Sequence, residues 1–402
     1  MRNSIAFILC GGQGERLLPL TKDRAKPAVH FGGIYRLIDF TLSNCLNSDL
    51  RRLFVLTQYK SFALEKHIYT GWNIFASGTS EFIHCLPPQK RVKGDWYRGT
   101  ADAVYQNFYS IRANIPDSIF ILSGDHVYKM DYRKMFRFHR RHKADVTIAM
   151  YRVPLAEASR FGVVEVDNGS RIVGFYEKPR TPIPMPGDAT HALVSMGVYL
   201  FNPQALVGPL MADAEDESSE HDFGKDVIPF MLKKGLRLFA YDFAENRVPG
   251  EEQMYWRDVG TIRSYWEANM DLVSIKPELN LYNDLWPLRT TPDFTPPAKC
   301  VFRQSLMDNS ILSGGCIITQ AELSNSVLCQ RVRIERGAQV FESVIFANVK
   351  IGEGAKIRNT IIDKNVHVPP FTRIGYSREE DEARGFKISD GITVVPKNYV
   401  FA

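Results

Sequence analysis

The 402-residue chain is 45% hydrophobic and 24% charged, with a formal net charge of +5. Its length allows more than one packed core, and its charge is too small and dispersed for the basic stripe of a nucleic-acid-binding protein. No apolar run approaches the ~20 residues of a membrane span, and six cysteines without a C-x-x-C pair argue against a zinc knuckle or a disulfide framework. We therefore expect a cytoplasmic protein with two domains that binds small anions, and neither nucleic acid nor a membrane.

The N-terminal two thirds of the chain alternates short apolar runs with amphipathic segments. Strands are predicted at 4–9, 51–59, 117–125, 145–153 and 195–201. Residues 132–142 have the spacing of an amphipathic helix, and the Asn168-Gly169 pair predicts a hairpin between two further β-like runs. This alternation indicates an α/β fold with a Rossmann-like, mostly parallel sheet that is covered by helices on both faces.

A second pattern begins after a proline-rich segment. Five prolines fall between residues 277 and 297, a density that excludes a regular helix or a central strand. Beyond it, apolar residues recur every five or six positions and align in rows of 17, in columns such as Val327, Val344 and Ile361 or Ile334, Ile351 and Val368. This is the hexapeptide-like period of a parallel β-helix with three strands per coil. We predict a catalytic domain at 1–275, a linker at 276–299 and a left-handed β-helix domain at 300–402.

The first predicted strand ends in a glycine-rich loop that reads G-G-x-G-x-R. Gly11, Gly12 and Gly14 let backbone N–H groups approach a phosphate closely, although glycines can also mark only a tight turn. The spacing fits neither the Walker pattern nor G-x-G-x-x-G, which argues against a P-loop hydrolase and a dinucleotide-dependent dehydrogenase. We expect Arg16, Arg24 and Lys26, which follow the glycines, to neutralise a polyphosphate.

Two aspartates are candidate metal ligands. Asp125 follows a buried-type strand, and open α/β sheets bind ligands at the carboxyl ends of their strands. Asp258 lies just before a helix that starts at a threonine, so its alternative role is to cap that helix. Mg²⁺ is usually bound by one or two carboxylates together with phosphate oxygens. The pair therefore predicts a Mg²⁺ site.

Two further short motifs add possible ligand contacts. Glu177 and Lys178 end the second strand of the predicted hairpin, although an exposed Glu-Lys pair is often only a surface ion pair. Gly99 and Thr100 precede a helical pattern whose first amides form a possible anion site. Together with the glycine loop and the carboxylates, these groups indicate phosphoryl or nucleotidyl transfer, which depends on positioning and charge neutralisation.

Several longer motifs resemble one family. The segments "GGQGERL", "RAKPAVHFGG", "WYRGTADAVYQN", "GDHVYKMDY", "HDFGKDVIP" and "YWRDVGTIRSYWEANMDL" are similar to bacterial ADP-glucose pyrophosphorylases, the glucose-1-phosphate adenylyltransferases, and the resemblance covers nearly the whole chain. It implies Mg²⁺-dependent conversion of ATP and glucose 1-phosphate to ADP-glucose and pyrophosphate, the committing step of glycogen synthesis. It also implies a homotetramer regulated by anionic effectors bound between the two domains.

The resemblance implies a role for each matched residue. Catalytic roles are implied for Arg16, Lys26 and Asp125, and metal ligation for Asp125 and Asp258. Nucleotide binding is implied for Gly11, Gly12, Gly14, Gln89, Tyr97, Gly99 and Thr100. Binding of glucose 1-phosphate is implied for Gly162, Glu177, Lys178 and Ser195.

Two positions depart from the family pattern. Glu15 replaces the usual threonine and places a negative charge beside the predicted phosphate site. Asp23 replaces a lysine that is common in relatives activated by sugar bisphosphates, and because a carboxylate repels phosphate, we do not expect bisphosphate activation at that position.

Three alternative functions are considered. The chain could be a non-catalytic regulatory subunit, but degenerate subunits lose loop glycines or metal carboxylates, and this chain retains them. It could use another nucleoside triphosphate, because a phosphate loop does not read the base. A hexapeptide acyltransferase with His367 as its base is a third possibility, for which few coils are present.

Overall fold

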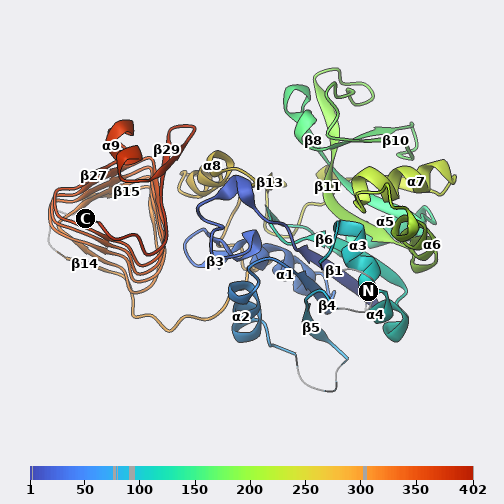
Figure 1. Ribbon diagram of the computed structural model, residues 1–402, viewed down its shortest axis with the longest axis horizontal. Coiled ribbons are helices and arrows are strands. Elements are labelled where there is room, and N and C mark those ends of the chain that lie inside the picture. The colour runs from blue at the N-terminus through green and yellow to red at the C-terminus, as the bar shows by residue number, and fades with distance from the viewer. Residues whose placement is uncertain (2, 76–77, 79, 90–95, 302–305, 402) are drawn as a thin grey trace.

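The computed structural model describes residues 1, 3–75, 78, 80–89, 96–301 and 306–401. An α/β part formed by the first two thirds of the chain stands beside a stack of short strands formed by the last third (Figure 1). Within the described residues, no helix is long and apolar enough to cross a membrane.

The α/β part is built on one mixed sheet in the order β10-β9-β11-β6-β1-β4-β5, with β8 beside β11 and β12 beside β8. The strands are β1 (Ser4–Cys10), β4 (Arg52–Thr57), β5 (Phe82–Leu86), β6 (Ser118–Ser123), β8 (Val146–Pro154), β9 (Gly162–Val166), β10 (Ile172–Glu177), β11 (His191–Phe201) and β12 (Leu238–Asp242). Strands β6, β1, β4 and β5 are mutually parallel, and β11 is antiparallel to β6 and β8. The carboxyl ends of the parallel strands therefore meet at one edge.

Helices cover both faces of this sheet. They are α1 (Leu37–Asn47), α2 (Phe62–Gly71), α3 (Thr100–Gln106), α4 (Phe108–Asn114), α5 (Tyr132–Arg141), α6 (Pro203–Glu215), α7 (Ile228–Lys233) and α8 (Ile262–Leu272). Alternate residues of β1 point to opposite faces, so Ile5 and Phe7 join the core under α3 and α6, while Ala6 and Ile8 join the core under α1 and α5. The predicted helix-covered sheet is confirmed, and the apolar runs form the expected strands.

Two short ribbons lie outside the main sheet of the α/β part. The pair β2 (His30–Phe31) and β3 (Tyr35–Arg36) precedes α1, and β7 (His126–Tyr128) pairs in antiparallel register with β13 (Trp256–Asp258). In the second pair Asp258 stands opposite His126, which brings two distant segments together at the end of β6. The predicted hairpin forms between β9 and β10.

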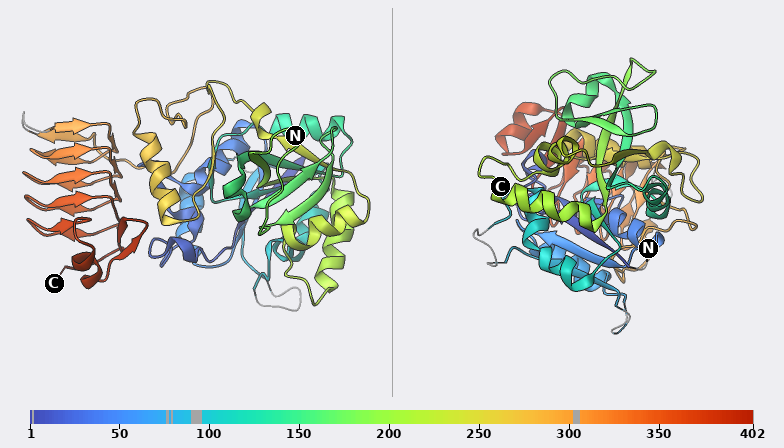
Figure 2. Two further views of the ribbon diagram at one scale, coloured as in Figure 1. Left: turned by 90° about the horizontal axis from the view of Figure 1, so that it is seen from above. Right: turned by 90° about the vertical axis from the view of Figure 1, so that its right-hand side faces the viewer.

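The last third of the chain forms three parallel sheets wound into a β-helix, as the 17-residue rows predict (Figure 2). Its strands are β14 (Lys299–Val301), β15 (Leu306–Asp308), β16 (Ile311–Leu312), β17 (Ile317–Thr319), β18 (Glu322–Ser324), β19 (Val327–Leu328), β20 (Arg333–Ile334), β21 (Gln339–Phe341), β22 (Val344–Ile345), β23 (Lys350–Ile351), β24 (Lys356–Arg358), β25 (Thr360–Ile362), β26 (His367–Val368), β27 (Arg373–Ile374), β28 (Lys387–Ser389) and β29 (Ile392–Val395). Val327 pairs with Val344 and Val344 with Ile361.

The last coil departs from the 17-residue period. Ile361 pairs with Val394 of β29, 33 positions later, because helix α9 (Arg378–Ala383) and strand β28 are inserted before β29. The buried carboxylate of Asp381 accepts hydrogen bonds from the Gly375 amide and from the Thr393 hydroxyl, which holds α9 over the end of the stack. The insertion therefore closes the end of the β-helix.

The segment between α8 and β14 crosses the surface of α1 without a helix or a strand of its own. Trp286 Nε1 donates to Asn44 Oδ1 at 3.0 Å, Asn47 Nδ2 donates to the Pro287 carbonyl at 2.9 Å, and the Arg289 amide donates to Ser43 Oγ at 2.9 Å. The proline-rich linker is thus fastened to the α/β part.

The inner sheet of the β-helix packs against the α/β part. Val327, Val344 and Ile361 share one hydrophobic cluster with Phe31 and with Leu272 of α8, and α8 lies beside the stack in Figure 2. The segment that follows the glycine loop and includes Phe31 therefore lies between the two parts.

Candidate active site

The glycine loop begins where β1 ends. Gly14 has a φ of 66°, and a Cβ there would lie 3.0 Å from Thr21 Cγ2, so this position requires glycine. A Cβ on Gly12 would meet nothing within 4 Å, so the space beside Gly12 is open. The loop is therefore locked at one end and accessible in the middle, as a phosphate-binding loop must be.

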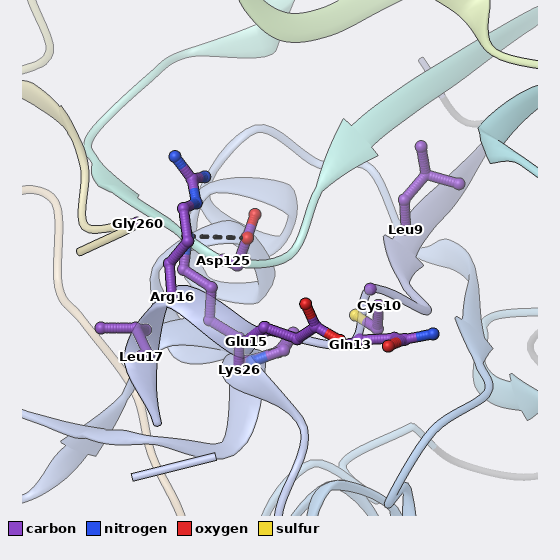
Figure 3. A pocket seen from close by; sticks show the side chains of 12 residues that line it. Leu9, Cys10, Gln13, Glu15, Arg16, Leu17, Lys26, Asp125 and Gly260 are labelled. Carbon is purple, nitrogen blue, oxygen red and sulfur yellow. Dashed lines mark ion pairs between the residues drawn. The ribbon is translucent and has the colours of Figure 1, made fainter. Parts of the chain in front are cut away.

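The open space belongs to two adjoining cavities of about 690 and 420 Å³. They share Leu9, Cys10, Gly12, Gln13 and Asp125. The larger cavity extends from the loop to the end of the β9–β10 hairpin, and the smaller lies over Arg16 and Lys26 (Figure 3). Both lie at the carboxyl ends of the parallel strands, where such sheets bind ligands.

At the boundary of these cavities, one ammonium group bridges two carboxylates. Lys26 Nζ is 2.9 Å from Asp125 Oδ2 (Figure 3) and 3.0 Å from Asp258 Oδ1, and the Lys26 side chain is only 9% exposed. His126 Nε2 lies 3.7 Å from Asp125 Oδ1 and 3.9 Å from Asp258 Oδ1. The β7–β13 pairing is what brings Asp258 to Asp125, while Thr261 caps α8, so Asp258 is not a helix cap.

Burial and charge act in opposite directions on this group of residues. Burial alone would raise the pKa of Asp125 and of Asp258, but Lys26 and His126 outweigh it and lower both pKa values. Burial would lower the pKa of Lys26, but the two carboxylates raise it. At neutral pH Asp125 and Asp258 are therefore carboxylates and Lys26 is an ammonium, so these three side chains together carry a net negative charge.

Arg16 lies close to the same carboxylates. A Cβ on Gly260 would be 2.9 Å from Arg16 Nη2 and 2.9 Å from Asp258 Oδ2, so only glycine leaves room for both groups. Glu15 is exposed at the rim of the smaller cavity.

Arg24 does not join this site. Its guanidinium binds Asp363 of the β-helix, so the prediction that Arg24 neutralises the phosphates is wrong.

Five of the predicted nucleotide-binding residues line the larger cavity, namely Gly11, Gly12, Tyr97, Gly99 and Thr100, and Gly14 lines the smaller one. The Tyr97 amide donates to Gln58 Oε1 at 3.0 Å, and Gln58 Nε2 donates back to the Tyr97 carbonyl at 3.3 Å. Burial raises the pKa of Tyr97 to about 12, so its hydroxyl stays protonated. Gly99 lies against His221, whose carbonyl oxygen would be 2.3 Å from a Cβ. Gly99 is therefore required by packing as well as by any ligand.

The predicted sugar-phosphate residues lie at the other end. Lys178 Nζ is 2.6 Å from Glu177 Oε1, with side chains 61% and 17% exposed, and both residues line the larger cavity. Gly162 stands opposite Glu177 in the hairpin, where a Cβ would be 2.9 Å from Glu177 Oε2. Ser195 Oγ accepts from the Gly197 amide at 3.2 Å. Gly162 and Ser195 thus lie behind cavity-lining residues.

One predicted residue cannot be related to the cavities. Gln89 follows β5 and directly precedes 90–95, which fall outside the described residues. Its nucleotide-binding role stays a prediction.

Sequence reasoning missed four residues that the fold brings to the cavities. These are Gln58, Ser123, His126 and Asp222. Gln58 and Ser123 stand at or just beyond the carboxyl ends of β4 and β6, a position that could have identified them. Ser123 Oγ donates to Asp125 Oδ1 and fixes its orientation. Asp222 accepts from Thr100 Oγ1 at 2.9 Å, which ties the two halves of the larger cavity together.

The residues present fit a divalent metal ion. Asp125 and Asp258 are ionised, belong to separate elements and are already close enough to share one cation. Hard carboxylate oxygens beside a phosphate loop are the donor set that Mg²⁺ prefers, the remaining ligands being phosphate oxygens and water. Within the described residues, no group of three or more His, Cys, Asp or Glu side chains is arranged to hold a metal by itself. The ion would therefore need ligands from a substrate as well.

Comparison with known proteins agrees with this geometry. The family model described as nucleotidyl transferase matches residues 5–274, and the model described as GlmU-like, C-terminal hexapeptide matches residues 296–395. The fold and the cleft are thus of the nucleotidyltransferase class.

Full-length relatives define the family more narrowly. A glucose-1-phosphate adenylyltransferase of Thermus thermophilus is 51% identical and covers 99% of both chains. One of Methylococcus capsulatus is 49% identical over 98% of this chain and 93% of its own, and one of Vibrio cholerae is 47% identical over the whole of both. The chain belongs to the glucose-1-phosphate adenylyltransferase family.

Proposed function

We propose that this protein is a glucose-1-phosphate adenylyltransferase, which converts ATP and α-D-glucose 1-phosphate to ADP-glucose and pyrophosphate. The observation that carries the proposal is the Lys26–Asp125–Asp258 group, located between an open glycine loop and the Glu177–Lys178 end of the hairpin. A cation site between a triphosphate site and a sugar-phosphate site is what this transfer requires.

Each group of residues in the cleft has its own role in the proposed reaction. The amides of the glycine loop and the Arg16 guanidinium bind the triphosphate and neutralise the pyrophosphate as it leaves. Lys178 binds the sugar phosphate, and Glu177 accepts hydrogen bonds from sugar hydroxyls. The sugar-phosphate oxygen attacks the α-phosphorus in line, so the α-phosphate moves from pyrophosphate to the sugar phosphate without a covalent enzyme intermediate.

Mg²⁺ would be held by Asp125 and Asp258, where it supplies charge neutralisation for the transferring phosphoryl group. Ser123 and Lys26 set the orientation of these carboxylates before it binds. The proposal needs no nucleophile in the cleft, because the attacking oxygen belongs to the substrate.

The predicted anionic effector also has a candidate site, between the two parts of the chain. Arg24 is held by Asp363 through two 2.9 Å contacts, yet Arg24 Nη1 and His30 Nδ1 are buried without a hydrogen-bond partner among the described residues. Burial, together with Arg36 and Arg24, lowers the pKa of Lys364 to about 8. A buried, cation-rich group with unused donors supports binding of an anionic metabolite there.

The same chemistry leaves two alternatives, a regulatory subunit and a different nucleotide. A non-catalytic subunit is disfavoured because both carboxylates, Lys26 and the loop glycines are present and assembled. The choice of base rests on the family alone, because the loop amides do not contact it.

The test is pyrophosphate release with Mg²⁺, glucose 1-phosphate and each of five nucleoside triphosphates, for wild type, Asp125→Asn and Asp284→Asn. Asp284 is exposed in the linker and serves as a control of equal charge change. We expect turnover with ATP, loss of turnover in Asp125→Asn, and wild-type behaviour in Asp284→Asn. Turnover with another nucleotide instead of ATP would mean that the nucleotide substrate is not ATP. No pyrophosphate release with any of the five would favour the regulatory subunit.

Three further expectations remain part of the proposal. The division at 1–275, 276–299 and 300–402 would be tested by limited proteolysis in the linker. The homotetramer would be tested by light scattering of the purified chain. A cytoplasmic location is consistent with six free cysteines, and fractionation of the producing cell would test it.

A further inference from the structure

Lys26 lies where a divalent ion would have to bind. It begins the short helix η2 (Lys26–Ala28), and the rigid Pro27 follows it. Its ammonium takes one oxygen of each aspartate, Asp125 Oδ2 and Asp258 Oδ1, at 2.9 and 3.0 Å. Ser123 Oγ donates to the second oxygen of Asp125. Both oxygens of Asp125 and Oδ1 of Asp258 are therefore already used by donors.

An ammonium and a metal ion cannot share this position. Two carboxylates this close repel each other, so a cation between them stabilises their ionised forms. A metal ion that binds both aspartates uses the same oxygen atoms and brings its own positive charge, which repels Lys26. Binding of the ion therefore requires that the ammonium leave.

The ammonium has an obvious place to move. Lys26 lines the 420 Å³ cavity together with Gly12, Gly14 and Arg16, so the glycine loop lies across this cavity from the Lys26 side chain. Beside the loop, the ammonium would face the phosphates of a bound nucleotide. The same charge would thus stabilise the carboxylates in the resting protein and the polyphosphate in the complex.

We infer that Lys26 is the resident cation of the metal site, which the incoming divalent ion displaces and thereby releases toward the phosphate loop. This inference rests on the proposed function for the role of the metal, but its tests use no substrate. The site keeps its charge compensated before and after metal binding, and the resting ammonium lowers the affinity for metal in the absence of nucleotide.

The first test is Mn²⁺ binding to metal-stripped, substrate-free protein, followed by electron paramagnetic resonance. Lys26→Met removes the competing ammonium, and we expect it to bind Mn²⁺ at least tenfold more tightly than wild type. Lys26→Arg keeps the charge and should bind as weakly as wild type. Lys22→Met changes an exposed lysine of the same segment and should leave affinity unchanged. Equal or weaker binding by Lys26→Met overturns the inference.

The second test uses only the wild-type protein and decides the question if Lys26→Met does not fold. Lysines are acetylated briefly with and without Mg²⁺, and the products are quantified by mass spectrometry. Because Lys26 is nearly buried and bridged, we expect its acetylation to rise several-fold when Mg²⁺ is added, while exposed Lys22 stays constant. No change at Lys26 overturns displacement.

Failure of the inference and failure of the proposed function give different results. If the wild type is active but Lys26→Met binds Mn²⁺ no more tightly, the displacement of Lys26 is contradicted and the proposed function stands. If the wild type shows no turnover but its Lys26 becomes reactive when Mg²⁺ is added, the displacement stands and the proposed function is contradicted.

Discussion

The catalytic cleft and the contact between the two parts of the chain bury similar charged groups in opposite proportions. In the cleft, one lysine is held by two aspartates. At the contact between the parts, Arg24, Arg36 and Lys364 lie near Asp363, and Arg24 Nη2 binds both oxygens of that carboxylate. The first group has an excess of negative charge and the second an excess of positive charge.

The pKa shifts reflect this difference. In the cleft the cation prevails over burial and lowers the pKa of both aspartates, whereas at the contact burial prevails and raises the pKa of Asp363. A buried group with excess charge is completed by a ligand of opposite sign. The difference in charge supports the proposed cation in the cleft and the proposed anion at the contact.

The largest effect is expected from Asp258→Asn, which removes one carboxylate from the cleft. A bound divalent ion supplies several kcal/mol of charge stabilisation to the transferring phosphate, so we expect turnover to fall about a thousandfold or more. Pyrophosphate release at saturating Mg²⁺ measures it. The exposed Asp284→Asn is the control, and a loss below tenfold would mean that Asp258 does not hold the metal.

Asp363→Asn removes the only carboxylate that binds Arg24 among the described residues. Breaking a buried ion pair leaves an uncompensated charge, and we expect the free energy of unfolding to fall by about 3 kcal/mol, which denaturant titration measures. Asp293→Asn breaks the exposed pair with Arg331 and should cost less than about 1 kcal/mol. An equal loss in the free energy of unfolding for the two variants would contradict the argument that burial makes the Arg24–Asp363 pair the more important one.

Ser123→Ala removes the hydroxyl that orients Asp125 but keeps both carboxylates. Loss of such an outer hydrogen bond lowers metal affinity or activity by about tenfold. We expect the Mg²⁺ concentration for half-maximal rate to rise by this factor with little change in unfolding free energy. An unchanged metal requirement would show that Lys26 alone fixes the carboxylate.

The smallest effect concerns pH at the contact between the parts. The groups near Lys364 include Arg24, His30, Arg36, Cys329 and Asp363. The Lys364 pKa of about 8 means that this side chain is charged below pH 8 and loses its proton above. An anion binds the charged form better, so sulfate affinity should fall several-fold between pH 7 and 9.5. Sulfate stays a dianion over this range, and calorimetry measures its binding.

Lys364→Met is the control for this experiment. It should bind sulfate weakly at both pH values, with no fall between them. A pH dependence that persists in Lys364→Met would assign the titration to another group.

The regular parts of the fold are predictable from the sequence because local patterns specify them. The alternation in β1 separates Ile5 and Phe7 from Ala6 and Ile8, and the columns through Val327, Val344 and Ile361 fix the coils of the β-helix. The insertion of α9 could not be found in this way, because a repeat predicts its own continuation and not its interruption.

The candidate site also contains residues that the sequence could predict and residues that it could not. The glycines, Asp125, Glu177 and Lys178 could be found because each follows a strand whose end is visible in the sequence. Gln58 and Ser123 also lie at or just beyond the end of a strand, but no distinctive motif surrounds them. Asp222 reaches the larger cavity through a contact between distant segments, whereas His126 directly follows Asp125 beyond the end of β6.

The sequence by itself determined the strands, the β-helix period, the glycine loop and the residue types that indicate a metal-assisted transfer. Only the tertiary structure decided how the charges pair. Lys26 and Asp258 meet because β13 pairs with β7, and Arg24 leaves the phosphate site for Asp363, 339 positions away. Side-chain pairing across such separations depends on burial and on the net charge of each group, which no local pattern specifies.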